Sequence, residues 1–163
     1  YYCRFGQTPS PLLNLPLSSD FQVMSFNTQI NPVLGEELNQ WHEVSDRKAL
    51  QEAIEGIAKI IPEQGTNMAM VFKAAMDMQP RPDNIFLITD GLPTQGDKSS
   101  NKGTVSGAER MKIFNRSMDL ILPGIPVNTL LLPLEGDTFA ASAFWRLAIA
   151  TRGAFVTPAK DWP

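Results

Sequence analysis

The chain has 163 residues, a length typical of one domain with a sizeable hydrophobic core. Hydrophobic residues make up 43% and charged residues 19%, a composition that excludes disordered and collagen-like chains. The formal net charge of −3 argues against nucleic-acid binding through bulk charge. The sequence contains no run of about 18 apolar residues, the length that a membrane-spanning helix needs.

The first half of the chain begins with a proline-rich segment, so we expect residues 1–14 to be poorly structured and residues 15–163 to form one domain. Apolar and polar residues alternate over 21–27, a pattern that predicts a strand. Weaker edge segments are predicted over 30–34 and 40–44. Apolar residues at helical spacing predict a helix over 46–61, capped by Ser45.

The second half alternates helices and strands of similar length. The continuous apolar run at 85–89 predicts a strand that is covered on both faces, as in a parallel sheet. Alternation of this kind predicts an α/β fold, a three-layer sandwich with a mostly parallel, doubly wound sheet. The other predicted elements are a helix over 67–78, a long loop over 91–103, a helix around 111–122, a strand over 127–132, a helix around 144–148 that Gly153 ends, and a strand over 154–157.

Several enzyme motifs are absent from the sequence. No Gly-x-Gly pair is present for dinucleotide binding, and Gly91 and Gly96 have P-loop spacing but Asp97 stands where the lysine is needed. His42 is the only histidine, no Gly-x-Ser-x-Gly motif accompanies it, and we expect it to have a structural or surface role. The single cysteine, Cys3, excludes an internal disulfide and a multi-cysteine metal site.

Two residues stand where an open parallel sheet binds ligands. Asp90 follows the apolar run at 85–89, so its carboxylate lies at the carboxyl end of a strand, where it suits either a turn or a hard divalent cation. Thr66 follows Gly65 at the start of a helix, where its hydroxyl suits either a helix cap or a metal ligand. The residues alone leave both alternatives open.

Taken together, these segments resemble the von Willebrand factor type A domain, in order and in spacing, over residues 15–163. The sequence of residues 82–96 is especially similar to that of uncharacterised bacterial members of the family. The matching pieces are the strand at 21–28, the Gly65-Thr66-Asn67 turn, the strand end at 85–91, the strand at 127–132 and the terminal pattern at 145–155.

The resemblance implies a non-enzymatic protein-interaction module that holds Mg²⁺ at a metal-ion-dependent adhesion site. It implies Thr66 and Asp90 as metal ligands, and an acidic side chain of a protein partner that completes the metal shell. It also implies a membrane anchor upstream of the domain in related bacterial proteins. The expected partner surface consists of Gly65, Asn67, Gly91 and Leu92.

The sequence departs from the family pattern at its beginning. The Asp-x-Ser-x-Ser motif is missing, and with it the first strand, which in the family lies between the strands that match 21–27 and 85–89. We therefore expect an N-terminally incomplete domain, either a fragment or a divergent form without its metal, and poor affinity for Mg²⁺. The alternatives in function are a metal-dependent hydrolase that uses Asp90 and a non-functional truncated remnant.

Overall fold

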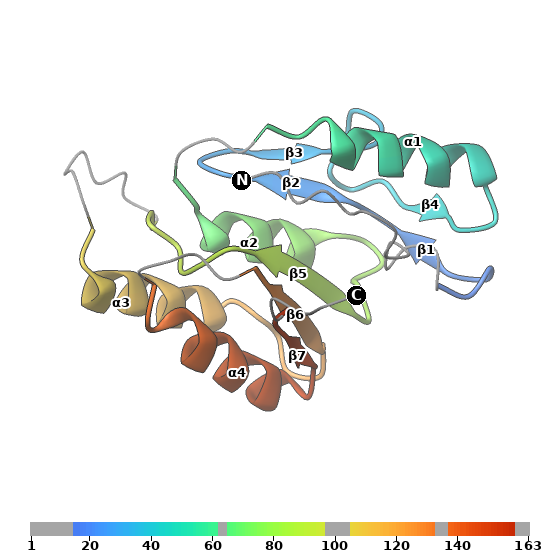
Figure 1. The fold of residues 1–163 in the computed structure, drawn as a ribbon. Coiled ribbons are helices and arrows are strands. Elements are labelled where there is room, and N and C mark those ends of the chain that lie inside the picture. Colours follow the sequence, from blue (N-terminus) through green and yellow to red (C-terminus); the bar gives the residue numbers. More distant parts are fainter. Residues whose placement is uncertain (1–14, 62–64, 97–104, 133–136, 159–163) are drawn as a thin grey trace. The chain divides into compact units, whose positions relative to one another are not determined.

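The structure is a computed structural model, and it describes residues 15–61, 65–96, 105–132 and 137–158. Contacts within the chain divide it into two compact units, which meet in the sequence between Gln64 and Gly65 (Figure 1). The predicted poorly structured segment at 1–14 lies outside the described residues. Each unit has its own strands and helices, and together they make an α/β protein.

The first unit contains four short strands and one helix among its described residues. β1 (Asp20–Phe21) pairs antiparallel with β4 (His42–Glu43), and β2 (Met24–Phe26) pairs antiparallel with β3 (Ile30–Pro32). The predicted strand at 21–27 is therefore two strands in two sheets, and the segments at 30–34 and 40–44 pair with its two halves instead of with each other.

Gln22 explains the division between β1 and β2. Its side-chain amide donates to the backbone carbonyl of Gln40 at 2.9 Å, and its Oε1 accepts a hydrogen bond from the N–H of Val23 at 2.8 Å. A side chain that satisfies backbone groups in this way competes with a regular strand ladder. Alternation in the sequence does not reveal this competition.

Helix α1 (Arg47–Ala58) covers the small core of the first unit. Asp46 caps it, because the carboxylate accepts from the N–H groups of Lys48 and Ala49, whereas the predicted cap, Ser45, donates to Glu43 instead. The helix ends before the predicted Ile61, and the side chains of Ile60 and Ile61 are exposed. The core consists of Phe21, Leu34, Val44, Ala49, Leu50 and Ala53.

The second unit contains a three-stranded parallel sheet in the order β5 (Ile85–Thr89), β6 (Val127–Leu131), β7 (Phe155–Val156). Strands β5 and β6 are in register from Ile85 against Val127 to Thr89 against Leu131. The helices are α2 (Met68–Asp77), α3 (Gly107–Met118) and α4 (Ala140–Thr151). Helix α3 contacts both other helices, and α4 packs against β6 and β7. The order of the elements agrees with the predicted alternation.

The core of this unit lies between one face of the sheet and the helices. Leu87 of β5 is buried, and the rings of Phe114 and Phe144 meet edge to face with centroids 5.0 Å apart. The alternate residues of β5, Phe86 and Ile88, remain 56% and 42% exposed. Within the second unit, the described helices therefore cover one face of β5, whereas the apolar run predicts cover on both faces.

The junction between α4 and β7 depends on two successive residues. Arg152 ends the helix in the left-handed conformation at φ 60°, so the predicted terminator, Gly153, is not the residue that adopts it. Gly153 is needed for another reason, because a Cβ atom there would lie 2.0 Å from the carbonyl oxygen of Val127. In the described part of the chain, no helix has the length and apolar character needed to cross a bilayer.

Candidate functional site

The turn before α2 is shaped by three consecutive residues. Gly65 has φ 84°, in the left-handed region that favours glycine. Asn67 is the N-cap, because its Oδ1 accepts a hydrogen bond from the N–H of Met70. The cap is thus Asn67, and the hydroxyl of Thr66 is left available for another role.

This turn is hydrogen-bonded to the loop that follows β5. The N–H of Thr66 donates to Oγ1 of Thr94 at 3.0 Å, and the carbonyl oxygen of Thr66 accepts from the N–H groups of Thr94 and Gln95, both at 3.1 Å. The side-chain amide of Asn67 donates to the carbonyl oxygen of Gly96. Residues 65–67 and 90–96 therefore form one structure, which we call the loop cluster. The sequence prediction named both segments but not their hydrogen bonds.

A buried ion pair supports the loop cluster from the other side. Oδ2 of Asp137 lies 2.7 Å from Nη2 of Arg110, and the two side chains are 3% and 17% exposed. The same Oδ2 accepts from the N–H of Leu92 at 2.8 Å, and Arg110 donates to the carbonyl oxygen of Leu92. Both backbone groups of Leu92 are thus satisfied by this pair.

Gly91 is required by the same ion pair. A Cβ atom at this position would lie 2.7 Å from Oδ2 of Asp137 and 3.1 Å from Nη2 of Arg110. Sequence reasoning missed Arg110 and Asp137, since neither belongs to a recognisable motif and both lie far from Leu92 along the chain. The glycine after Asp90 is the one local signal of a close approach at this point.

Asp90 is exposed at the carboxyl end of β5. The hydrogen bonds of the turn come instead from the buried Thr89, whose hydroxyl donates to the carbonyl oxygen of Gly91 at 3.1 Å. Because the hydroxyl of Thr89 makes the hydrogen bonds within the turn, the carboxylate of Asp90 is not needed to form it. None of the ion pairs within the described residues involves it.

The predicted partner surface is mostly buried. Asn67, Gly91 and Leu92 are buried, and Gly65 is half-buried, so these residues shape the loop cluster more than they present side chains to a partner. The accessible side chains of the cluster belong to the exposed Asp90 and to the half-buried Thr66, Thr94 and Gln95. A contact surface at this place would use them.

The donor set for a metal ion is sparse. Among the described residues, no three His, Cys, Asp or Glu side chains lie close enough together to hold a metal. Asp90 supplies one carboxylate to the loop cluster, and Thr66 supplies one hydroxyl. This set does not by itself fit a Mg²⁺ site, which needs near-octahedral oxygen ligands.

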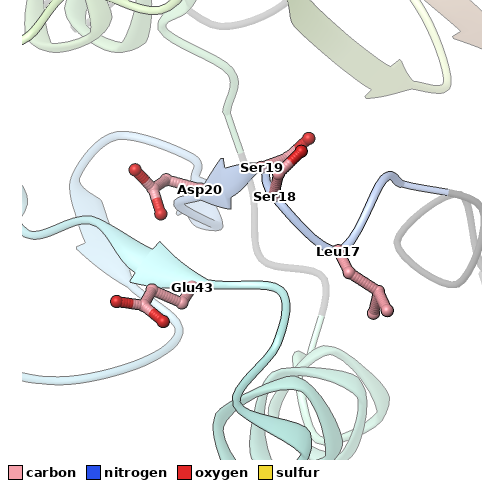
Figure 2. Close-up of a pocket in the computed structure, with 5 residues that line it drawn as sticks. All are labelled: Leu17, Ser18, Ser19, Asp20 and Glu43. Carbon is pink, nitrogen blue, oxygen red and sulfur yellow. The ribbon is translucent and has the colours of Figure 1, made fainter.

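Two polar features lie in the first unit, apart from the predicted site. A hollow of about 190 Å³ is lined by Leu17, Ser18, Ser19, Asp20 and Glu43, and the two carboxylates are on paired strands (Figure 2). The ring of His42 lies tilted against that of Phe21, with ring centroids 5.9 Å apart, and its buried Nε2 has no hydrogen-bond partner among the described residues.

Comparisons with protein-family models, with curated proteins and with solved structures give no significant match for this chain. The likeness to the type A domain therefore rests on the sequence motifs alone.

Proposed function

We propose that the chain is a non-enzymatic protein-interaction module of the von Willebrand factor type A class, which binds a protein partner through the loop cluster. In this proposal, the parallel sheet and helices of the second unit belong to a three-layer sandwich with a doubly wound sheet. The metal site is incomplete, and Mg²⁺ contributes little to binding.

The observation that supports this proposal is an exposed carboxylate on a firmly held loop. Asp90 is accessible, whereas Thr89 and Gly91 on either side of it are buried. Hydrogen bonds to Thr66 and the Arg110–Asp137 pair hold the residues that follow. A preorganised group loses little conformational entropy on binding, and ligands of open parallel sheets bind at the carboxyl ends of the strands.

Two recognition modes are compatible with this surface. The resemblance implies an acidic partner residue that reaches Asp90 and Thr66 through a shared Mg²⁺ ion. An exposed carboxylate without an ion-pair partner among the described residues also suits a basic partner residue directly. The dependence of binding on Mg²⁺ separates the two modes.

Site-specific crosslinking tests the proposal. A photoreactive amino acid is placed at position 90, and as a matched control at Asp77, which is exposed at the opposite end of α2. We expect a discrete crosslinked partner from position 90 alone, and a weaker product when Asp137→Asn loosens the loop. Equal labelling from both positions would contradict a partner surface at the loop cluster.

The same preparation tests the alternative in which the protein is an enzyme. Phosphate and ester substrates are offered to the unmodified chain with millimolar Mg²⁺, and we expect no turnover. Hydrolysis that Asp90→Ala abolishes, with the variant still folded, would assign the site to a hydrolase instead.

A further inference from the structure

Asp90 and Gly91 form the one Asp-Gly sequence in the chain, and they lie directly after β5. Aspartate followed by glycine is prone to isomerise, because glycine has no side chain to obstruct attack of its backbone nitrogen on the preceding carboxyl group. Asp90 is exposed, the hydroxyl of Thr89 makes the hydrogen bonds within the turn, and neither ion pair of the described residues involves Asp90. Its carboxyl group is therefore available to react with the main chain.

The reaction rearranges the main chain without an oxidant, a reductant or a cofactor. The nitrogen of Gly91 attacks Cγ of the protonated Asp90 carboxyl group. An N–Cγ bond forms, and the carboxyl hydroxyl leaves as water with the amide hydrogen, which gives a succinimide ring. Water then opens the ring. Cleavage of the N–Cγ bond restores aspartate, whereas cleavage between the nitrogen and the Asp90 carbonyl carbon gives isoaspartate, and either carboxylic acid then releases its proton.

The fold restrains the residue that supplies the attacking nitrogen. Gly91 is buried, and a Cβ atom there would lie 2.7 Å from Oδ2 of Asp137 and 3.1 Å from Nη2 of Arg110. The N–H of the next residue, Leu92, donates to the same Oδ2 at 2.8 Å. Ring closure must turn the peptide group between Asp90 and Gly91, and this movement either presses Gly91 against the ion pair or pulls Leu92 away from it. The reaction therefore requires the loop to open.

The hydrogen bond of the nitrogen itself offers little protection. The N–H of Gly91 has a long contact of 3.5 Å with Oγ1 of Thr89, which is beyond the usual range for a hydrogen bond. Restraint of the loop thus comes mainly from the buried Arg110–Asp137 pair.

We propose that Asp90 is a site of spontaneous isomerisation to isoaspartate, and that the Arg110–Asp137 pair sets its rate by keeping the loop closed. A reaction confined to an open state proceeds in proportion to the population of that state when opening and closing are fast. Isoaspartate adds a methylene to the main chain, so the hydrogen bond from Thr89 to the carbonyl oxygen of Gly91 loses its geometry. This inference concerns the covalent structure of the loop and does not depend on the proposed function.

Peptide mapping by liquid chromatography and mass spectrometry measures the reaction. The unmodified chain is incubated at neutral pH, folded in buffer or unfolded in guanidinium chloride, and is digested at intervals. The isoaspartate peptide has the same mass as its parent but elutes separately, and electron-transfer fragmentation identifies the modified residue. We expect isomerisation at Asp90 to be at least about tenfold slower in the folded chain than in the unfolded chain.

Substitutions then test the role of the ion pair. Asp137→Asn keeps the size of the side chain and removes the charge that pairs with Arg110, so we expect isomerisation at least about tenfold faster than in the unmodified folded chain. The matched control is Glu52→Gln, which removes a charge from the exposed Lys48–Glu52 pair and should leave the rate unchanged. Thermal unfolding confirms that each variant is folded at the temperature of incubation.

Two further variants complete the test. Arg110→Lys keeps the positive charge but not the planar group that contacts both Asp137 and Leu92, and it should also accelerate the reaction. Asp90→Glu lengthens the carboxyl arm, so a succinimide cannot form and the isomerised peptide should disappear.

Three results would overturn the proposal. The first is an equal rate at Asp90 in the folded and unfolded chain, and the second is no isoaspartate at Asp90 even in the unfolded chain. The third is a rate that Asp137→Asn and Arg110→Lys leave unchanged, or that Glu52→Gln raises equally, which would remove the ion pair as the cause.

Discussion

At the scale of single residues, Asp137 joins three parts of the second unit. Its Oδ2 accepts from the N–H of Leu92 and pairs with Arg110 of α3, and the residue itself lies just before α4. A buried carboxylate is costly unless it is paired and hydrogen-bonded, and here it is both. The geometry of the loop after Asp90 therefore depends on a residue 47 positions away in the sequence (Asp90 to Asp137).

Removal of this carboxylate should be strongly destabilising. Asp137→Ala leaves the guanidinium of Arg110 without its partner and the N–H of Leu92 without its acceptor. We expect the free energy of unfolding to fall by about 3 kcal/mol, measured by urea denaturation. The control is Glu52→Ala, which removes the exposed Lys48–Glu52 bridge and should cost less than about 0.5 kcal/mol. Similar losses in both variants would show that the Arg110–Asp137 pair contributes no more to stability than an exposed ion pair does.

Mg²⁺ should bind weakly to the loop cluster, since Thr66 and Asp90 are a small fraction of an octahedral shell. We expect millimolar Mg²⁺ to stabilise the chain by less than about 1 kcal/mol in thermal unfolding. Asp90→Ala serves as the control, because its response to Mg²⁺ should match that of the unmodified chain. A larger stabilisation that this substitution abolishes would instead show that the two residues suffice to bind the ion.

At the scale of elements, the junction of α4 with β7 sets how closely the helix approaches the sheet. The N–H of Thr129 in β6 donates to the carbonyl oxygen of Ala154 at 2.8 Å, which fixes the start of β7. Gly153 passes directly beside the backbone of Val127, where no side chain fits. The parallel pairing of β6 with β7 therefore requires a glycine at this position.

Gly153→Ala should separate β7 from β6. The added Cβ would lie 2.0 Å from a backbone oxygen, which cannot rotate away, so we expect a loss of about 3 kcal/mol or more in the free energy of unfolding. The matched control is Gly124→Ala, where φ is +94° and the Cβ has nothing within 4 Å. That variant should lose about 1–2 kcal/mol from backbone strain alone. Equal losses in the two variants would contradict the close approach to Val127 as the reason for Gly153.

At the scale of the whole molecule, β5 is one of the two outer strands of the described three-stranded sheet and exposes two large apolar side chains, Phe86 and Ile88. The strand itself contains no charged residue and no proline. Outer strands of soluble proteins usually carry such residues, because they discourage pairing with other chains. We therefore expect this surface to favour association between copies of the chain.

A charge placed on β5 should reduce that association. Ile88→Lys is expected to lower concentration-dependent light scattering at neutral pH, with little change in the temperature of unfolding, because the side chain is already exposed. Leu120→Lys, at another exposed apolar position in the same unit, is the control and should leave scattering unchanged. An equal effect of both substitutions would point to net charge as the cause.

The sequence alone predicted the helices and the strands of the second unit well, because their signals are local. Each signal acts over a few neighbouring residues. Examples are the apolar spacing of the helices, the N-cap Asn67 near the predicted helix start and the apolar run at 85–89. It predicted the first unit less well, since Gln22 interrupts a strand through hydrogen bonds to residues distant in the sequence. The sequence also singled out Thr66 and Asp90 from their places beside a helix start and a strand end.

What only the tertiary structure decided is which of these groups meet and which are buried. The ion pair of Arg110 with Asp137, the burial of Leu92 and the exposure of Phe86 all depend on the packing of distant segments. Local patterns determine helices because helical hydrogen bonds and capping are short-range. Strand pairing, burial and ion pairing depend on long-range contacts that one-dimensional spacing does not encode.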